Sequence, residues 1–511
     1  MINSQSEVIN FLSKSSAYGL EPRAVNRCET HGAIVFLVGD RAYKLKRAVR
    51  FPYMDYSSVE RRHAMCQAEI SINRPLAPEI YIGVRPIVRN ADGTLRIGSA
   101  HERDAAVDWL VVMHRFDQSA LFSSLCDRGA LTVRLVRQLA ERIAVFHQHT
   151  LKSESHGGLK GISTVVEECS AIFGKMTDAL PQEKILTFER LAREALLHDG
   201  PLLEARRLDG HVRRCHGDLH LNNICLLNGT PVLFDAIEFS DDFACIDLLY
   251  DFAFLVMDLE RHGRGMEANV LLNRYLARTG DYSGLGALPL FLACRAAIRA
   301  HVTVTAAIVA EATIFRNKAH EATQLLELSV DYLTPKGVRL IAIGGLSGTG
   351  KSTLAASLAP TIGRRPGAIV VRTDELRKEL WGIGDELRLP QGAYSKEFSS
   401  RVYAVLAERT SLILKSGQSV IADGVFGTRP ERDAVRQLAE ALGISFSGLW
   451  LEGPQPILEK RIEGRIEDVS DATVAVLHSQ MRDVEVPHDW KQIFVAGPAR
   501  EILSKAKRAL D

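Results

Sequence analysis

The stretch HGDLHLNNI, residues 216–224, places an aspartate and an asparagine at a spacing that suits phosphoryl transfer. That reaction needs a carboxylate beside the acceptor hydroxyl and oxygen ligands for the magnesium ion that bridges the phosphates. Asp218 and Asn223 are five positions apart, a spacing at which one loop can supply both the carboxylate and a metal ligand. A second metal carboxylate should end a short strand downstream, and VLFDAIEF supplies Asp235 there. We therefore predict Asp218 as the base, with Asn223 and Asp235 as Mg²⁺ ligands.

A second motif, GLSGTGKS, matches the phosphate-loop (Walker A) pattern GxxxxGK[ST] in full. It follows an apolar strand and opens a helix, which is the context that confirms the motif. Glycines let backbone N–H groups point inward at phosphates, and the helix N-terminus adds a favourable dipole field. Lys351 is expected to contact the β- and γ-phosphates and Ser352 to bind Mg²⁺. The predicted nucleotide contacts are Gly345, Leu346, Ser347, Gly348, Thr349, Gly350, Lys351, Ser352 and Thr353.

Further charged residues follow the phosphate loop. In RTDELRK, Asp374 ends a predicted strand and Arg377 lies one turn later on the same helix face, although a helix cap is the alternative role for Asp374. Asp423 ends the next buried strand, where it suits a metal or substrate ligand or a simple turn residue. Arg461 and Arg465 are four positions apart on one helix face, typical either of a phosphate clamp on a lid or of a solvated charged helix.

The elements that must position the first motif begin with strands and continue as helices. Residues 33–46 alternate around a turn, which predicts a β-hairpin, and a helix is expected at 57–74. Further strands are expected at 80–88 and 107–113. Helical patterns then cover 131–149, 163–176, 185–197, 246–261, 266–278 and 287–327. This order predicts an α+β domain with two lobes.

The elements around the second motif alternate instead. Short apolar strands are expected at 339–345, 368–374, 419–425, 445–451 and 493–497, with helices between them. This spacing predicts an α/β P-loop domain with a parallel five-stranded sheet covered by helices on both faces. Pro335 and Gly337 mark the boundary, so we expect two domains, residues 1–330 and 331–511.

HGDLHLNNI followed by LFDAIEF resembles the aminoglycoside phosphotransferase and choline kinase family, whose members are relatives of the protein kinases. The resemblance implies that Asp218 is the catalytic base, Asn223 a Mg²⁺ ligand and Asp235 the main Mg²⁺ ligand. Glu238 is a weaker metal candidate. In DLLYDFA, the resemblance implies that Asp251 braces the backbone of the catalytic loop rather than reacting.

The same resemblance implies a strand lysine that holds phosphates and pairs with a helix glutamate. AYKLK offers Lys44 and Lys46 on one side of a strand, and the sequence alone does not choose between them, although Lys44 fits the A-x-K pattern. Glu69 is preferred to Glu60 as the partner. The backbone of VVMHRF, around Met113, is expected to bind adenine.

The second part resembles the small P-loop kinases, which include gluconate and shikimate kinases, polynucleotide 5′-kinases and zeta-toxin-like enzymes. This resemblance implies that Asp374 activates the acceptor hydroxyl and that Arg377 holds the substrate. It also implies that Arg461 and Arg465 clamp the transferring phosphate.

The overall composition is that of a globular protein, with 46% apolar and 24% charged residues. A formal net charge of +1 indicates no polyanion partner, so nucleic acid is conceivable only as a substrate of the second domain. No CxxC pair occurs among the eight cysteines, which excludes a zinc knuckle and suits a cytoplasmic protein. No signal peptide and no membrane span are expected, because charges interrupt the apolar stretch 290–315. The sequence does not indicate an oligomeric state.

Each motif set is nearly complete by itself, so the sequence predicts two separate Mg²⁺–ATP sites in a bifunctional ATP-dependent phosphotransferase. The first would act on a small-molecule hydroxyl, and the second on a sugar-like hydroxyl or a polynucleotide 5′-OH. One alternative is a single catalytic half that ATP binding or hydrolysis in the other half regulates. Another is a nucleotide-sensing interaction protein.

Overall fold

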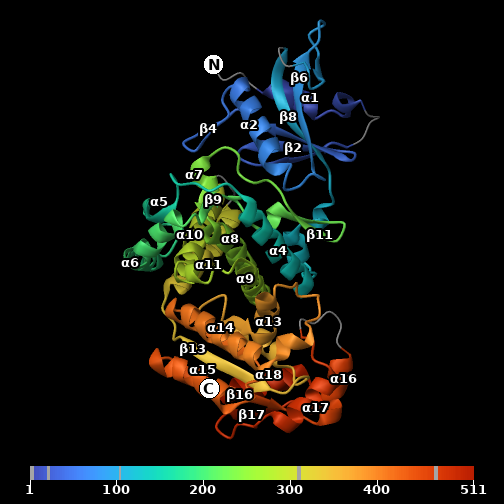
Figure 1. The fold of residues 1–511 in the computed structure, drawn as a ribbon. Coiled ribbons are helices and arrows are strands. Elements are labelled where there is room, and N and C mark those ends of the chain that lie inside the picture. The colour runs from blue at the N-terminus through green and yellow to red at the C-terminus, as the bar shows by residue number, and fades with distance from the viewer. Residues whose placement is uncertain (1–4, 20–23, 103–104, 308–311, 465–469, 511) are drawn as a thin grey trace. The chain divides into compact units, whose positions relative to one another are not determined.

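The chain forms two compact units, which are built from interleaved segments of the sequence. The first unit comprises Met1–Glu168 and Leu203–Asp258, and the second comprises Cys169–Leu202 and Leu259–Asp511. The helices after Asp258 therefore belong to the same compact unit as the P-loop sheet. The boundary predicted at residue 330 divides the chain by sequence and is a different division from this one. The computed structural model (Figure 1) describes residues 5–19, 24–102, 105–307, 312–464 and 470–510.

A six-stranded antiparallel sheet dominates the start of the first unit, in the order β1-β2-β3-β8-β6-β7. The predicted hairpin is present as β2 and β3, which lie beside β8. The strands are β1 (Asn26–Glu29), β2 (Ala33–Val38), β3 (Arg41–Lys46), β6 (Tyr81–Arg89), β7 (Leu95–Ile97) and β8 (Ala106–His114). Apolar side chains from both faces of the sheet are buried, and one face packs against a helix.

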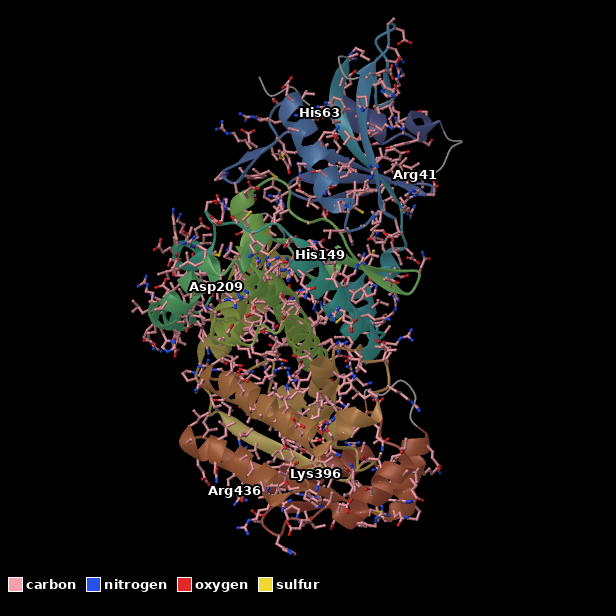
Figure 2. All side chains as sticks on the ribbon, in the orientation of Figure 1. Arg41, His63, His149, Asp209, Lys396 and Arg436 are labelled. Carbon is pink, nitrogen blue, oxygen red and sulfur yellow. The ribbon has the colours of Figure 1, made fainter. Side chains whose placement is uncertain are left out.

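That helix is α2 (Val59–Asn73), which begins where Ser58 accepts the N–H of Arg61. It is fixed to β8 by a buried ion pair in which Nε of Arg62 lies 2.8 Å from Asp108. His63, labelled in Figure 2, stacks on Trp109 with ring centroids 3.7 Å apart. These contacts anchor the helix that carries Glu69.

The remainder of the first unit holds the catalytic loop between short strands. Residues 215–223 connect β9 to β10, and the β10–β11 hairpin leads to Asp235. The elements are α3 (Phe122–Asp127), α4 (Val133–His149), β9 (Val212–Arg214), β10 (Ile224–Leu227), β11 (Thr230–Leu233), α7 (Asp241–Ala244), β12 (Cys245–Asp247) and most of α8 (Leu248–Arg261). Helix α5 (Gly158–Phe173) and helix α6 (Gln182–Leu208) each contribute to both units.

The second unit contains a five-stranded sheet in the order β14-β15-β13-β16-β17, with every neighbouring pair parallel. The predicted parallel sheet is thus confirmed. Its strands are β13 (Arg339–Gly345), β14 (Ile369–Arg372), β15 (Val420–Asp423), β16 (Ser445–Glu452) and β17 (Lys491–Phe494). Alternate strand residues pack against α12 and α18, and the others are buried beneath α14 and α15.

The connecting helices are α12 (Lys351–Leu358), α13 (Thr373–Trp381), α14 (Lys396–Lys415), α15 (Arg429–Ala441), α16 (Gln455–Glu463), α17 (Val474–Asp483) and α18 (Ala499–Leu510). The same unit includes α9 (Gly265–Thr279), α10 (Leu288–Ala307) and α11 (Ala312–Leu333). The single helical pattern expected at 287–327 is therefore two helices. Because Oγ of Ser329 donates to the carbonyl of Ala293 at 2.9 Å, α10 and α11 run antiparallel.

Among the described residues, α10 is the one helix long and apolar enough to cross a bilayer. Of its most apolar stretch, 61% is buried inside the protein. This is the behaviour of a core helix, as expected from the charges in the sequence.

Candidate active sites

Two lysines of β3 share one glutamate in the first unit. Nζ of Lys44 lies 2.9 Å from Glu69, and Nζ of Lys46 lies 2.6 Å from the other oxygen of the same carboxylate. Lys44 also lies 2.5 Å from Asp235, whereas Lys46 bonds to Glu238 and is only 1% exposed. The structure thus brings Lys44, Glu69 and Asp235 together and places Lys46 deeper.

The charges of this cluster depend on one another. Burial raises the pKa of Glu69, but the ammonium groups of Lys44 and Lys46 outweigh it and lower that pKa to about 2. Burial lowers the pKa of Lys44, but Asp235, Glu69 and Glu238 together raise it well above its ordinary value. Glu69 and the two lysines are therefore ionised near neutral pH. Glu60, the other candidate partner, is exposed in the first turn of α2.

Asp251 of α8 braces the catalytic loop, as the sequence indicated. Its carboxylate accepts the N–H of Gly217 at 2.8 Å and the N–H of His216 at 3.2 Å. Nε2 of His147 lies 3.1 Å from the same carboxylate. Gly217 has φ +81°, and a Cβ there would lie 2.9 Å from the carbonyl of Phe243, so only glycine fits beside Asp218.

Asp218 is oriented by two side chains. Asn223 donates its Nδ2 to the Asp218 carboxylate and to its backbone carbonyl, each at 3.0 Å. This leaves the carbonyl oxygen of Asn223 as the atom that would bind a cation. Nε2 of His220 lies 3.3 Å from Asp218, while its Nδ1 accepts the N–H of Asn222. These two contacts hold the His220 ring beside the predicted base.

Several contacts hold the loop after β11. Asp235 in this loop has φ +62°, a strained conformation for a residue with a side chain, so the surrounding contacts must stabilise it. Its N–H donates to the hydroxyl of Tyr81 at 3.1 Å. Asn73, at the end of α2, accepts the N–H of Ala236 at 2.7 Å and donates to its carbonyl at 3.1 Å. Nε2 of His216 lies 2.9 Å from the carbonyl of Phe234, and burial lowers the pKa of this histidine, which keeps its ring neutral.

Met113 lies within the sheet rather than at its end. It is in register with Ala42 of β3 on one side and Tyr81 of β6 on the other, and it is 9% exposed. Arg41, labelled in Figure 2, reaches the ring of His114 at 3.0 Å, where β8 ends. Backbone groups that could pair with adenine would therefore come from residues after the strand, and the role of Met113 stays a prediction.

The phosphate loop of the second unit lies where β13 meets α12. Gly350 precedes α12 with φ +87°, and Lys351 donates its Nζ to the carbonyl of Leu346 at 3.0 Å. Gly348, with φ +83°, passes so close to α16 that a Cβ would lie 2.7 Å from the carbonyl of Leu458. A cavity of about 630 Å³ opens above the loop and includes Thr353 in its lining.

Asp423 ends β15 beside the phosphate loop, as predicted. It is 4% exposed, and its carboxylate accepts the hydroxyl of Ser352 at 2.6 Å. Burial raises its pKa, although Arg372 and Lys351 oppose that effect. Arg372, the last residue of β14, lies 3.3 Å from Asp423 and donates to Oγ of Ser352 at 2.9 Å.

Asp374 and Arg377 both line the cavity, and their roles toward an acceptor stay predictions. Asp374 lies in the first turn of α13 rather than at the end of β14, because the strand stops at Arg372. Arg377 is 8% exposed and donates to the carbonyl of Ala393 at 2.6 Å and to Oγ of Ser399 at 3.1 Å. Its guanidinium also lies over the ring of Tyr394, 5.1 Å from the centroid. These contacts fix one wall of the cavity.

Arg461 lies against the phosphate loop from the side of α16. It donates to the carbonyl of Thr349 at 3.4 Å and to the carbonyl of Val495 at 2.9 Å, and it lines the cavity. Arg465, its predicted partner, lies outside the described residues. The phosphate-clamp role of the pair stays a prediction.

Sequence reasoning missed residues that contact these loops and side chains or line the cavity. They are Tyr56, Asn73 and His220 in the first unit and Arg372, Gln480 and Glu431 in the second. Arg372 had a local signal, because it directly precedes the strand-to-helix junction at Asp374. Gln480 had none, since it comes from α17 to accept the N–H of Ser347 at 2.8 Å.

Comparison with known proteins gives two family matches. A model of the phosphotransferase enzyme family matches residues 99–288, and a model described as an AAA domain matches residues 340–487. An uncharacterized protein of Mycobacterium tuberculosis (strain ATCC 25618 / H37Rv) is 29% identical over 493 residues, 94% of each chain. An adenylyl-sulfate kinase of Myxococcus xanthus (strain DK1622) is 29% identical over 123 residues, 24% of this chain and 62% of that protein.

A solved gluconokinase from Sinorhizobium meliloti 1021 is 23% identical and covers 34% of this chain and 91% of its own, with a TM-score of 0.26. The two family matches confirm the predicted pairing of a phosphotransferase-like part with a P-loop part. The chain is an enzyme of the kinase and phosphotransferase class in which a segment similar to the phosphotransferase enzyme family precedes a P-loop kinase segment.

Proposed function

We propose that the chain is a bifunctional ATP-dependent phosphotransferase with two separate Mg²⁺–ATP sites. One observation supports the proposal: each compact unit by itself holds a lysine, an acidic candidate base and candidate metal ligands of the kind that phosphoryl transfer needs. The first unit contains Lys44, Asp218, Asn223 and Asp235, and the second contains Lys351, Ser352, Asp374 and Asp423. Neither set takes a side chain from the other unit.

The side chains at both sites fit a magnesium ion. Asn223 and Asp235 offer amide and carboxylate oxygens, and Ser352 and Asp423 offer hydroxyl and carboxylate oxygens, which are the hard ligands that Mg²⁺ prefers. When bound, the ion would supply positive charge that offsets the negative charge on the phosphates of ATP during transfer. ATP itself would contact Lys44 in the first unit and the backbone of the phosphate loop in the second.

At the first site Asp218 would accept the proton of the acceptor hydroxyl. Its carboxylate is held by Asn223 and His220, so the oxygen that faces the acceptor is fixed before substrate arrives. Lys44 would exchange its contact with Asp235 for the phosphates while keeping Glu69. That exchange would release Asp235 for the metal.

At the second site a small-molecule hydroxyl suits the cavity better than a polynucleotide end. Asp374 and Glu431 bring carboxylates to the acceptor side, and the hydroxyls of Ser399, Tyr403 and Thr428 line it. Arg377 is already bonded to Ala393 and Ser399, so its guanidinium is restrained within the cavity wall. The adenylyl-sulfate kinase relative acts, by its name, on a small molecule as well.

Two variants of the full chain test the proposal. Asp218→Ala should abolish one phosphorylated product and Lys351→Ala a different one, when a metabolite panel and ATP are screened by mass. Loss of the same product in both variants would contradict two independent sites. It would favour the alternative in which one half regulates the other.

We also propose that the enzyme works in the cytoplasm. All eight cysteines lie among the described residues, and all are free thiols, seven of them buried. Free thiols in a chain of this size suit a reducing compartment. Fractionation of the native host should recover the protein with cytoplasmic enzymes.

A further inference from the structure

Two asparagines of α9 complete the outer edge of the P-loop sheet. β14 is the terminal strand of that sheet, with β15 on its inner side. On its outer side, Asn269 donates Nδ2 to the carbonyl of Ala368 at 3.0 Å. Asn273, one turn later, accepts the N–H of Val370 at 2.7 Å and donates to the same carbonyl at 3.3 Å.

The carboxamide of Asn273 takes the place of a peptide group from a further strand. A side-chain amide offers the same donor and acceptor as a peptide. Along a strand, the carbonyl of one residue and the N–H two positions later point to the same side, where a parallel neighbour would bond to both. Asn273 bonds to this pair on Ala368 and Val370. Its Nδ2 also donates to Oδ1 of Asn269 at 3.1 Å, which fixes both amides in place.

The strand held in this way leads directly to the active site. Two residues after Val370 comes Arg372, which contacts Ser352 and Asp423. Asp374 follows in the first turn of α13 and faces the cavity. A shift of β14 would therefore move the predicted base of the second site.

Neighbouring contacts hold the far end of α13 to the same helical segment. Nη1 of Arg274, adjacent to Asn273, lies 2.5 Å from Asp385 in the loop after α13. Arg409 of α14 binds Glu379 of α13 through both guanidinium nitrogens, at 2.7 and 2.9 Å, and lies over the ring of Tyr282, 4.8 Å from its centroid. The strand before Asp374 and the loop after α13 thus both contact residues 265–286, and α14 links Glu379 of α13 to Tyr282.

We propose that Asn273, supported by Asn269, is a positioning residue of the second active site. Its carboxamide holds the β14 edge so that Arg372 and Asp374 face the phosphate loop. The inference rests on the proposed phosphotransferase function of that site. It also assigns to the P-loop site two residues that lie inside the match to the phosphotransferase enzyme family, which covers residues 99–288.

A purely structural role would have a different signature. The phosphate loop follows β13, and β15 separates that strand from β14. Loosening β14 should therefore leave the grip on ATP intact while it disturbs the acceptor side. General destabilisation of the unit would weaken both.

The first experiment measures amide hydrogen exchange in the full chain, by mass spectrometry of peptides that cover residues 368–377. Asn273→Ala should raise exchange there about tenfold, because the N–H of Val370 loses a buried acceptor. Asn273→Asp keeps an acceptor for that N–H and should restore part of the protection. Met266→Ala, an exposed change on the same helix, is the matched control. Unchanged exchange in Asn273→Ala, or an equal change in Met266→Ala, would overturn the proposal.

The second experiment measures turnover with water as acceptor in chains that also carry Asp218→Ala, which silences the first site. The Lys351-dependent hydrolysis of ATP should fall about tenfold in Asn273→Ala, with the KM for ATP unchanged. If the KM for ATP rose by the same factor as kcat fell, Asn273 would only stabilise the unit, and the inference would be overturned. If the parent chain shows no Lys351-dependent hydrolysis of ATP, the exchange experiment decides the role of Asn273, and the product screen of the Lys351→Ala variant decides the proposed function of the site.

Discussion

The ammonium group of Lys44 lies 2.5 Å from the carboxylate of Asp235, the residue predicted to bind the metal. Lys46, two residues away, instead bonds to Glu238 and is 1% exposed. Replacement of each lysine is therefore expected to have a different effect. Lys44→Met should weaken ATP binding at the first site with a modest loss of stability.

Lys46→Met should instead destabilise the first unit by about 3 kcal/mol, because it removes one partner of a buried ion cluster. Isothermal titration with ATP and denaturant titration separate the two effects. If Lys46→Met lost ATP affinity while keeping full stability, the assignment of Lys44 as the phosphate-contacting lysine would be wrong.

Replacement of Asp251 by asparagine should slow transfer at the first site without preventing ATP binding. The carboxylate accepts two backbone N–H groups of the catalytic loop, at 2.8 and 3.2 Å, so the change displaces Asp218. A displacement of this kind costs about 10²-fold in rate. Product formation by mass and ATP affinity by titration give the two readings. Asp242→Asn, at a side chain that is 87% exposed, should change neither.

Removal of Arg372 should tighten divalent-cation binding at the second site. The guanidinium contacts both Ser352 and Asp423, so a cation that binds these oxygens must displace it. Arg372→Ala is expected to raise the affinity for Mn²⁺ in the presence of ATP several-fold, whereas Arg372→Lys keeps the charge and should change it less. Electron paramagnetic resonance of free Mn²⁺ gives the affinity. A weaker affinity in the alanine variant would mean that Arg372 helps to hold the metal-bound nucleotide.

The second unit should lose stability on mild acidification because of His301 in α10. Burial lowers the pKa of this histidine to about 4. As the pH falls from about 6.5 toward 4, the unfolded chain takes up a proton that the folded chain does not, so the free energy of unfolding decreases by about 1 to 3 kcal/mol. Below that range His301 is protonated in both the folded and the unfolded state, and the free energy of unfolding stops decreasing on its account.

His301→Phe should remove this dependence and His320→Phe, at an exposed site, should keep it. Hydrogen exchange of the α10 amides at several denaturant concentrations measures the free energy at each pH. Equal slopes against pH in the two variants would exclude His301 as the cause.

Much of this arrangement could be predicted from the sequence, because it depends on local patterns. The phosphate loop, the five parallel strands and the β2–β3 hairpin each follow from residues within one short stretch. The convergence of Lys44, Glu69 and Asp235 needed the additional knowledge that a strand lysine and a helix glutamate pair in such enzymes. The two-lobed arrangement of the first domain stays a prediction.

Other relationships had no local signal, because they join distant parts of the chain. Asn273 and Val370 are 97 positions apart, and nothing in GMEANVLLNRYLART distinguishes an asparagine on a helix surface from one that bonds to a sheet edge. The register that places Met113 opposite Ala42 and Tyr81 likewise joins separate strands, although a strand is expected at 107–113. Contacts of this kind depend on tertiary packing, which rules about residue spacing do not predict.

The carbonyl of Ala368 finds its partner in Asn269, 99 positions earlier in the chain. A fragment that began at residue 331 would carry β14 without either asparagine. Exposed strand edges pair with one another across molecules, and proteins that cannot cover them aggregate. The solubility of the P-loop kinase segment is thus expected to depend on a helix that a cut at the sequence boundary would remove.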